Sequence, residues 1–313
     1  MSQPNTFSFP HGLDIFGDIH GHADALRGLL KKLGYRIHQG AYRHPAGRKA
    51  FFLGDLLDRG PKIRETVHLV RAMVTAGEAR MILGNHEMNA LRYHHYDRMG
   101  KPLRAHEGSK RRQHQPSLDQ FADPHPDEWR ETLDWFAEQP LWADLGPLRL
   151  VHACWDPAAL ATLDGHGPLR GENLERLSRK GTVGAKAVER ILNGPEALLP
   201  AGHEQILHDG SRRPDIRIRW WEGYTGQTCR EWIFPANPEI PDLPPVPRSI
   251  PKSRPYGEEE PLLFFGHYAI TGEIPGPILP NLACLDYGLG KEGNLVAYRW
   301  NGERQLRPEH FIQ

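Results

Sequence analysis

In the stretch DIFGDIHGH, residues 14–22, a short apolar run is followed by two groups able to bind a metal, the Asp18 carboxylate and the His20 imidazole. The same pattern recurs in FFLGD at 51–55, MILGN at 81–85, LRLVH at 148–152 and LLFFGH at 262–267. These four runs end in Asp55, Asn85, His152 and His267. Five apolar runs of strand length, each ending in a ligand-type side chain, predict buried strands that deliver these groups to one place.

Helical patterns separate the first three runs. Residues 22–34 carry apolar side chains at helical spacing and stop at a glycine, and residues 61–78 open on a proline. Residues 87–97 follow the third run and also read as helical. This alternation predicts an α/β fold with a largely parallel central sheet. Ligands in such sheets bind beyond the carboxyl ends of the strands, where the groups that follow these runs fall.

The later part of the chain has a weaker pattern. Residues 126–140 predict an amphipathic helix, and residues 158–193 read as mainly helical. Short strands are predicted at 215–221 and 231–234, where β-branched and aromatic residues gather.

Two segments predict irregular structure. The basic stretch 104–112 reads as a surface loop that could recognise an anionic substrate, although a charge run is usually a solvated face. Residues 235–261 contain nine prolines and predict an extended segment rather than a packed element. Because candidate ligands lie on both sides of the proline-rich segment, we expect a single domain over residues 1–313.

Composition excludes several classes of partner. The chain has 39 basic and 39 acidic residues, so no overall charge favours a nucleic-acid or membrane partner. Its three cysteines, Cys154, Cys229 and Cys284, form no CxxC pair and no even disulfide set. We therefore expect a reduced, cytoplasmic protein.

The candidate ligands form a mixed donor set of carboxylates, an amide oxygen and imidazoles. Such a set suits first-row divalent metals, whereas magnesium or calcium sites use mostly oxygen. One bridging carboxylate holds two ions about 3.5–4 Å apart, which lowers the pKa of a bound water and neutralises phosphoryl oxygens. We expect two divalent ions, with manganese first and iron or zinc as alternatives.

Three neighbouring residues fit chemistry on a phosphate ester. Arg59 can grip phosphate with two parallel hydrogen bonds. His86 directly follows Asn85 and is free to donate a proton. Asp58 can orient that histidine and favour its charged form.

Three blocks now carry a family resemblance: GDIHG at 17–21, GDLLDRG at 54–60 and GNHE at 84–87. All three blocks are complete and occur in the same order as in the signature of the calcineurin-like metallophosphoesterases, which they resemble. The resemblance is greatest to the phosphoprotein phosphatase branch of that family. The family's later metal histidines resemble LVHACWD and FFGHY in this chain. The resemblance implies a four-layer α/β/β/α sandwich, with two sheets face to face and helices outside.

Residue by residue, the resemblance implies a first metal at Asp18 and His20 and a bridging carboxylate at Asp55. The second metal would be completed by Asn85, His152 and His267. The resemblance further implies that Arg59 holds phosphate and that His86, paired with Asp58, protonates the leaving oxygen.

The chain departs from the family pattern in two places. The usual HGG block reads His152-Ala153-Cys154 here, which alters the local backbone beside a metal ligand. His267 is followed by Tyr268 and Ala269, so the second histidine of GHxH is absent, as in the phosphoprotein phosphatase branch. The family also has a second phosphate-binding arginine, for which Arg219 and Arg230 are equal candidates.

Three functions stay open at this point. The first is hydrolysis of phosphomonoesters, including phosphoserine or phosphothreonine in proteins. The second is hydrolysis of dinucleoside polyphosphates, as in the symmetrical bacterial diadenosine tetraphosphate hydrolases that share these blocks. The third is a catalytically silent binding protein, against which the intact Asp55, Asn85, His86 and Arg59 argue.

Overall fold

The first sheet has five strands in the order β17-β16-β1-β4-β5. The computed structural model describes residues 8–206, 210–252, 254–291 and 293–313. The strands are β1 (Leu13–Phe16), β4 (Lys49–Phe52), β5 (Ala79–Met81), β16 (Ala297–Trp300) and β17 (Phe311–Ile312). β1, β4 and β5 run parallel, whereas β16 pairs antiparallel with β1. β1 therefore lies inside the sheet, between β4, which follows it closely in the chain, and β16, which is formed by residues 297–300.

A second sheet has four strands in the order β13-β12-β7-β6. They are β6 (Trp142–Asp144), β7 (Leu148–Val151), β12 (Leu262–Phe265) and β13 (Leu282–Cys284). β12 pairs parallel with both β7 and β13, and only the pair β6–β7 is antiparallel. Both sheets are therefore mixed, with a parallel centre.

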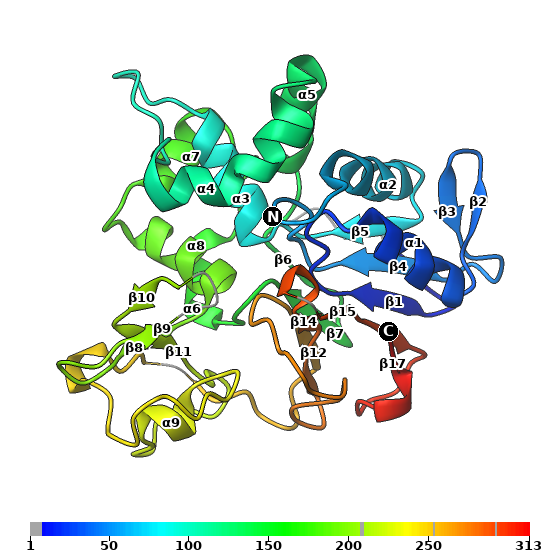
Figure 1. The fold of residues 1–313 in the computed structure, drawn as a ribbon. Coiled ribbons are helices and arrows are strands. Elements are labelled where there is room, and N and C mark those ends of the chain that lie inside the picture. The colour runs from blue at the N-terminus through cyan, green and yellow to red at the C-terminus, as the bar shows by residue number, and fades with distance from the viewer. Residues whose placement is uncertain (1–7, 207–209, 253, 292) are drawn as a thin grey trace.

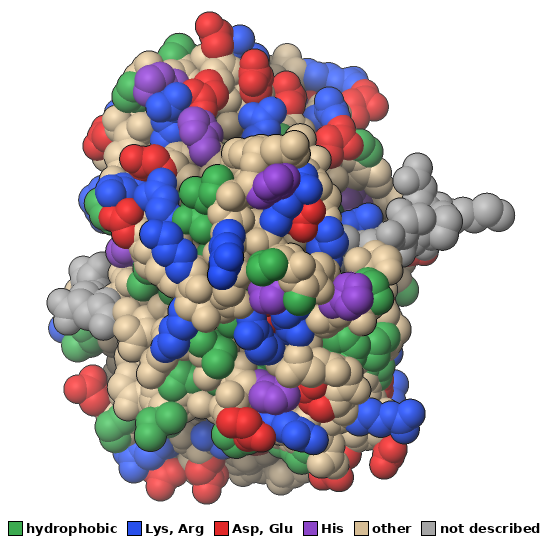
Figure 2. Space-filling model, turned by 90° about the vertical axis from the view of Figure 1, so that its right-hand side faces the viewer, with side chains coloured by type: hydrophobic (Ala, Val, Ile, Leu, Met, Phe, Trp, Pro, Cys, Tyr) green, Lys and Arg blue, Asp and Glu red, His purple; other side chains and the backbone are tan. Residues whose placement is uncertain are grey.

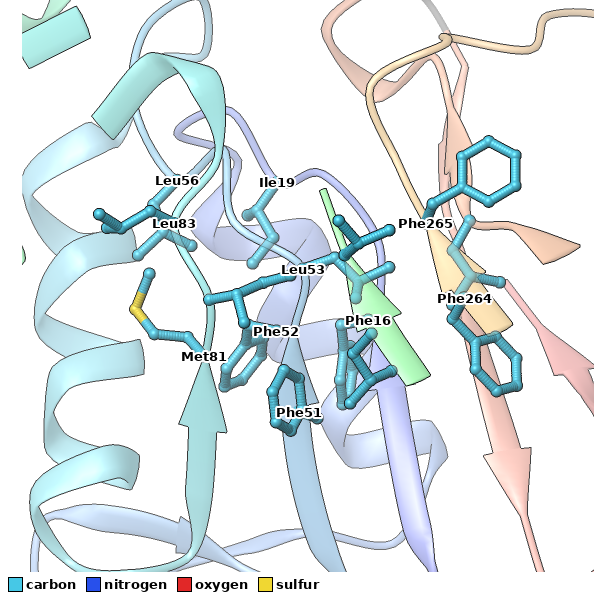
Figure 3. Close-up of a cluster of buried hydrophobic side chains, with 14 of the residues drawn as sticks. Phe16, Ile19, Phe51, Phe52, Leu53, Leu56, Met81, Leu83, Phe264 and Phe265 are labelled. Carbon is cyan, nitrogen blue, oxygen red and sulfur yellow. The ribbon is translucent and has the colours of Figure 1, made fainter. Parts of the chain in front are cut away.

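The two sheets pack face to face through a buried apolar core. Phe264 of β12 and Tyr298 of β16 bring their ring centroids within 5.0 Å of each other. Within the first sheet, Phe16 and Phe52 lie 5.1 Å apart (Figure 3). Figure 3 shows these side chains of the first sheet beside those of β12. Burial of large aromatic groups on both inner faces stabilises this packing.

Helices cover the outside of the sandwich. Figure 1 shows α1 (Ala23–Lys32) and α2 (Ile63–Thr75) beside the first sheet. On the other side of the molecule lie α6 (Pro157–Leu163), α7 (Gly171–Ser178) and α8 (Val183–Asn193) (Figure 1). Ala153 and Cys154, just after β7, donate hydrogen bonds to the Ile191 carbonyl of α8. The predicted four-layer α/β/β/α sandwich is confirmed.

A third group of helices follows β5. It consists of α3 (Asn85–His94), α4 (Gly108–Ser117), a π-helical turn (Leu118–Ala122) and α5 (Pro126–Ala137). The prediction of a loop over residues 104–112 is wrong in its second half, because α4 begins at Gly108. α4 has no apolar stripe; its buried side chains are His114 and Ser117. Polar contacts rather than apolar packing therefore hold this helix, and sequence periodicity does not reveal them.

Residues 194–261 form a smaller region with its own core. Its elements are β8 (Glu196–Leu198), β9 (Gln205–Ile206), β10 (Arg212–Arg213), β11 (Asp215–Arg217), α9 (Cys229–Trp232) and a 3₁₀ turn (Pro247–Ser249). The strand predicted at 231–234 is wrong, because Thr228 and Glu231 form a capping box that begins α9. The described part of the proline-rich segment contains only the short 3₁₀ turn, as an extended segment would.

The remaining elements are short. They are β2 (Arg36–His38), β3 (Ala41–Arg43), β14 (Asp286–Tyr287), β15 (Asn294–Leu295) and two 3₁₀ turns (Leu289–Lys291 and Pro308–His310). Figure 2 shows one face of the molecule, where basic, acidic and histidine side chains are interspersed and hydrophobic groups form small scattered patches. Within the described ranges, no helix combines the length and the apolar character that crossing a membrane requires.

Candidate metal centre

The candidate ligands are buried where strands of both sheets end. The first sheet contributes four of them and the second sheet two. Asp18 and His20 follow β1, Asp55 follows β4 and Asn85 follows β5. His152 follows β7, and His267 follows β12. None of these residues is more than 8% exposed. The two sheets together thus bring side chains from distant parts of the chain into one buried cluster.

The Asp55 carboxylate lies at the middle of this cluster. Its Oδ2 lies 3.6 Å from His20 Nε2, and its Oδ1 lies 3.5 Å from His152 Nε2. Asp18 approaches from the first side, with Oδ2 at 4.0 Å from His20 Nε2. One carboxylate that turns its two oxygens toward two different groups of donors has the arrangement of a bridging ligand.

Asn85 and His267 lie on the second side. Asn85 Oδ1 is 2.8 Å from His267 Nδ1 and 3.0 Å from His152 Nε2. Ligand-type atoms of Asp55, His152 and His267 all lie within 4.8 Å of one another. Asp55, His152 and His267 could therefore bind the same ion without a large movement of the chain.

Two of the imidazoles are oriented by backbone carbonyls. His20 Nδ1 donates to the Leu57 carbonyl at 2.9 Å, and His152 Nδ1 donates to the Leu53 carbonyl at 2.8 Å. Because Nδ1 carries the proton of a neutral ring in His20, its Nε2 turns a lone pair toward the cluster, and His152 Nε2 is directed to the cluster in the same way. Metal-binding histidines are typically held by such hydrogen bonds from their second nitrogen.

Two buried atoms of this cluster, Asp18 Oδ1 and His267 Nε2, make no hydrogen bond with the residues that the structure describes. Buried polar groups in proteins are almost always paired, so two unpaired acceptors in one cluster indicate a missing binding partner. Carboxylate and imidazole atoms together fit first-row divalent cations. The residues present therefore fit a pair of such ions.

The electrostatics of the cluster favour neutral imidazoles at its two sides. Burial lowers the pKa of His20 well below its ordinary value, and the Arg59 charge lowers it further. Burial likewise lowers the pKa of His267, with the Arg217 charge acting in the same direction. Neutral imidazole is the form that binds metal.

The carboxylates concentrate negative charge at the centre. Burial and the nearby Asp286 carboxylate raise the pKa of Asp18 well above its ordinary value. Burial would also raise the pKa of Asp55, but His152 and His86 outweigh it and lower that pKa. The pKa of His152 is in turn raised by Asp55, against the effect of burial, to about 10. A buried site with this charge balance favours a bound cation.

Glycines let the chain approach the carboxylates closely. A Cβ on Gly84 would lie 2.1 Å from Asp55 Oδ1, and one on Gly266 would lie 2.1 Å from Asp18 Oδ1. Any larger residue would displace the carboxylate. The glycines in MILGN and LLFFGH are therefore required by the ligand positions themselves.

Glu87 holds the loop that carries Asp55, a role the sequence analysis missed. Its buried carboxylate accepts backbone hydrogen bonds from Gly84, Asp55, Leu56 and Leu57 at 2.7–3.3 Å. These bonds tie the loop after β4 to the start of α3. The GNHE block itself was the available signal, because Glu87 is its last residue.

His86 and Asp58 form a buried pair beside the cluster. His86 Nδ1 lies 2.6 Å from Asp58 Oδ2, and His86 Nε2 lies 3.8 Å from Asp55 Oδ2. Burial would raise the pKa of Asp58, but hydrogen bonds from His114 and His86 lower it well below its ordinary value. Asp58 is thus a charged carboxylate on one side of the ring, and Nε2 faces the candidate ligands on the other.

The arginines occupy different places. Arg59 is exposed and packs beside the Leu289–Lys291 turn, where a Cβ on Gly290 would lie 2.6 Å from Arg59 Cδ. Arg219 pairs with Glu222 at 3.5 Å, and Arg230 donates to the Ile240 carbonyl at 2.7 Å; neither of these contacts involves a candidate ligand.

Arg217 contacts the centre, although the sequence analysis did not single it out. Its Nη1 donates to the backbone carbonyl of His267 at 3.2 Å, and its guanidinium lies 5.9 Å from the centre of the Tyr268 ring. The short strand β11 positions it there. DIRIRWW contains two arginines, Arg217 and Arg219, and nothing in the sequence distinguishes the one that reaches the centre.

Two mixed sheets thus bring a buried cluster of carboxylate, amide and imidazole groups together where their strands end. The sequence profile described as calcineurin-like phosphoesterase matches residues 13–235. The chain belongs to this family.

Curated relatives share different parts of the chain. The symmetrical bis(5'-nucleosyl)-tetraphosphatase of Dechloromonas aromatica is 33% identical over 296 residues, which is 90% of both chains. The asymmetrical bis(5'-nucleosyl)-tetraphosphatase of Halalkalibacterium halodurans is 48% identical over 80 residues, 26% of this chain and 32% of that protein. The chain thus spans about a third of the length of the asymmetrical relatives it matches.

A solved structure shows the same fold. The cold-active protein-tyrosine phosphatase of a psychrophilic Shewanella superposes with a TM-score of 0.52 at 15% identity. The match covers 99% of this chain and 83% of that one. At this identity the likeness concerns the fold alone.

Proposed function

We propose that the chain hydrolyses phosphoric esters with two divalent ions, manganese first and iron or zinc as alternatives. Asp18 and His20 would hold one ion, and Asp55 would be shared. The other ion would be held by Asn85, His152 and His267. When bound, such a pair supplies a nucleophile near neutral pH and charge neutralisation for the phosphoryl group. The unpaired buried atoms of Asp18 and His267 support this assignment.

Residues of the chain itself handle the proton and the phosphate. His86 Nε2 faces the ligands and delivers the proton that the leaving oxygen needs. The Asp58 carboxylate lies 2.6 Å from Nδ1 and fixes the orientation of the ring. Arg59, exposed at the rim and beside His20, holds the non-reacting oxygens of the phosphate.

For the substrate we propose a dinucleoside polyphosphate. The observation that carries this choice is the symmetrical tetraphosphatase, which matches 90% of both chains at 33% identity. The asymmetrical relatives match only about a quarter of this chain. The symmetrical relative therefore resembles segments that the asymmetrical relatives do not match, and we assign the choice of substrate to those segments.

Phosphomonoesters, which the sequence analysis ranked first, are the second candidate. The absence of a second histidine after His267 favours them, because it matches the phosphoprotein phosphatase branch. Both substrate classes use the same ligands and the same phosphate grip. The metal centre therefore does not distinguish the two substrate classes, and an activity assay is needed to do so.

The test compares three substrates on purified, manganese-loaded protein: diadenosine tetraphosphate, a phosphoserine peptide and p-nitrophenyl phosphate. Symmetrical cleavage of the tetraphosphate yields two ADP molecules, whereas asymmetrical cleavage yields ATP and AMP. We expect ADP as the sole nucleotide product, with the highest kcat/KM of the three. Turnover of the phosphopeptide without turnover of diadenosine tetraphosphate would contradict the proposed substrate. It would identify phosphomonoesters as the substrate class instead.

A further inference from the structure

A chain of hydrogen bonds continues beyond the His86–Asp58 pair into α4. Asp58 Oδ2 accepts from His86, and Asp58 Oδ1 accepts from His114 Nδ1 at 3.0 Å. The Ser117 hydroxyl also donates to Oδ1, at 2.5 Å, and accepts the Asp58 backbone N–H at 3.1 Å. Both carboxylate oxygens are therefore occupied, and among the described residues α4 supplies the side-chain partners of Asp58 other than His86.

The position of these groups follows from the helix. His114 and Ser117 are three residues apart, so they lie on the same face of α4. They are its only buried residues, with His114 3% exposed. Pro116 lies between them, and the helix continues as a π-helical turn over Leu118–Ala122. π-Helical turns are frequent at functional sites.

A second histidine packs against the opposite edge of the His114 ring. His114 Nε2 lies 3.3 Å from His94 Nε2, while His114 Nδ1 donates to the Asp58 carboxylate. Burial, together with His114 and His106, lowers the pKa of His94 to about 3, so His94 is neutral. A neutral imidazole has one N–H and one lone pair, so His94 can pair with His114 Nε2 and hold that ring in place.

α4 also reaches the other end of His86. The side-chain amide nitrogen of Gln113 lies 3.3 Å from His86 Nε2, the atom that faces the candidate ligands. Gln113 in turn accepts a hydrogen bond from Arg104. One helix thus contacts both the carboxylate behind the imidazole and the imidazole nitrogen in front.

We infer that His114 is a positioning residue for the proton donor, acting through Asp58; this inference rests on the proposed function of His86. An aspartate with a single partner can rotate about its χ angles and swing away from the imidazole. Hydrogen bonds on Oδ1 from His114 and Ser117 prevent that rotation and keep Oδ2 on His86 Nδ1. The Nε2 proton is then aimed at the leaving oxygen.

The experiment uses two substrates of nearly equal size, p-nitrophenyl phosphate and phenyl phosphate. Phenol is a poorer leaving group, with a pKa of about 10, and depends more on a donated proton. The variants are His114→Leu, which removes the donor, and His114→Asn, which keeps an N–H near the Nδ1 position. Ser117→Ala removes the second donor on Oδ1 with little change of volume. His106→Leu is the control, because His106 stacks on Tyr93 in the same aromatic cluster without touching Asp58.

We expect His114→Leu to lose about tenfold more kcat on phenyl phosphate than on p-nitrophenyl phosphate, the worth of one hydrogen bond to a charged group. Ser117→Ala should show the same selectivity in weaker form, and His114→Asn should restore most of the rate. The control should lose both activities equally or not at all. Equal losses on both substrates for His114→Leu and Ser117→Ala would overturn the inference.

A second measurement is independent of activity. In zinc-loaded protein with ¹⁵N-labelled histidine, the His86 Nδ1 proton bonded to Asp58 should give a downfield resonance. It should be retained in His114→Asn and lost or shifted in His114→Leu; an unchanged resonance in His114→Leu would overturn the inference. If His86→Asn itself loses both substrates equally, the proton-donor role of His86 fails, and the resonance alone decides whether His114 holds Asp58.

Discussion

Residues 13–94 and residues 194–261 are built in different ways. The first region places three parallel strands in one large sheet, and each is followed by a buried loop. The second region has strands of two or three residues in separate two-stranded pairs. Its core contains eight buried hydrophobic residues that pack apart from the main core. The first region contributes four candidate ligands, and the second contributes none.

Backbone geometry shows what this difference means. In the first region, His20, Asp55, Asp58 and Arg59 adopt left-handed backbone angles, with φ between 46° and 66°. Such conformations cost on the order of 1–3 kcal/mol each and persist only where the surroundings impose them. No described non-glycine residue in 194–261 has a positive φ. The candidate site residues of the first region are therefore held in strained backbone conformations by the structure around them. The second region carries no such constraint, and we expect it to affect how substrates reach the site.

The largest expected effect comes from the shared carboxylate. Asp55→Asn removes one charge that faces both His20 and His152, so metal content should fall for both ions together. The loss of kcat/KM should exceed about a hundredfold, because even partners of metal ligands are worth 10–100-fold. Elemental analysis of the variant checks the first point and steady-state kinetics the second.

Chelation is the matching control for that variant. Metal-stripped wild type should be equally inactive, and manganese, iron or zinc should restore it better than calcium. Two ions per chain in Asp55→Asn would show that this carboxylate is not shared. That result would contradict the proposal that a residue of the first region joins the two metal sites.

A smaller loss is expected at the rim of the first region. Arg59→Lys keeps the charge but loses the planar fork that grips phosphate. The loss in kcat/KM should be about tenfold or more, and it should be similar for every phosphate ester. Wild-type kinetics of Arg59→Lys on all substrates would show that this arginine does not bind phosphate.

The second region should change selectivity rather than chemistry. Arg217→Met removes its hydrogen bond to the His267 carbonyl, with an expected loss of about fivefold for a bond worth about 1 kcal/mol. Metal content should stay at the wild-type level, and diadenosine tetraphosphate should be affected more than p-nitrophenyl phosphate. A uniform loss of more than a hundredfold would place Arg217 with the first region instead.

The smallest effect on activity is expected in the small core. Trp232 is fully buried there and lies 4.8 Å from the Tyr224 ring. Trp232→Ala should lower the free energy of unfolding by about 3–5 kcal/mol while leaving kcat at 25 °C nearly unchanged. Phe264→Ala is the matched change between the two sheets.

Calorimetry on these two variants tests the expected single domain. One cooperative domain predicts a single transition that shifts in both variants. Two transitions, with only the lower one shifted by Trp232→Ala, would make residues 194–261 a separate folding unit.

Much of the first region could be predicted from the sequence because its signals are local. Apolar runs of strand length alternate with helical spacing, and these patterns gave β1, α1, β4, α2 and β5 in order. The ends of the runs also identified the residues that the structure brings together around Asp55. Agreement of local pattern with tertiary role is expected where a segment is buried on a regular sheet.

The contacts of α4 could not be predicted in this way. GSKRRQHQPS has no apolar periodicity, so the helix forms by tertiary polar contacts that propensity does not describe. His114 and Asp58 are 56 residues apart, and nothing local pairs them. The short helix at Cys229–Trp232 is a different case, because Thr228-x-x-Glu231 is a capping box that could have been recognised.

The pairing of β1 with β16 has a consequence for synthesis. Asp14 and Arg299 face each other across these strands, although 285 residues separate them in the chain. While the ribosome is still working, the edge of β1 stays open, and open edges invite pairing with other chains. His267 also emerges late. The set of candidate ligands is therefore incomplete until His267 has left the exit tunnel, and the first sheet until residues 297–300 have done so. The nascent chain has to remain soluble with its first sheet unfinished.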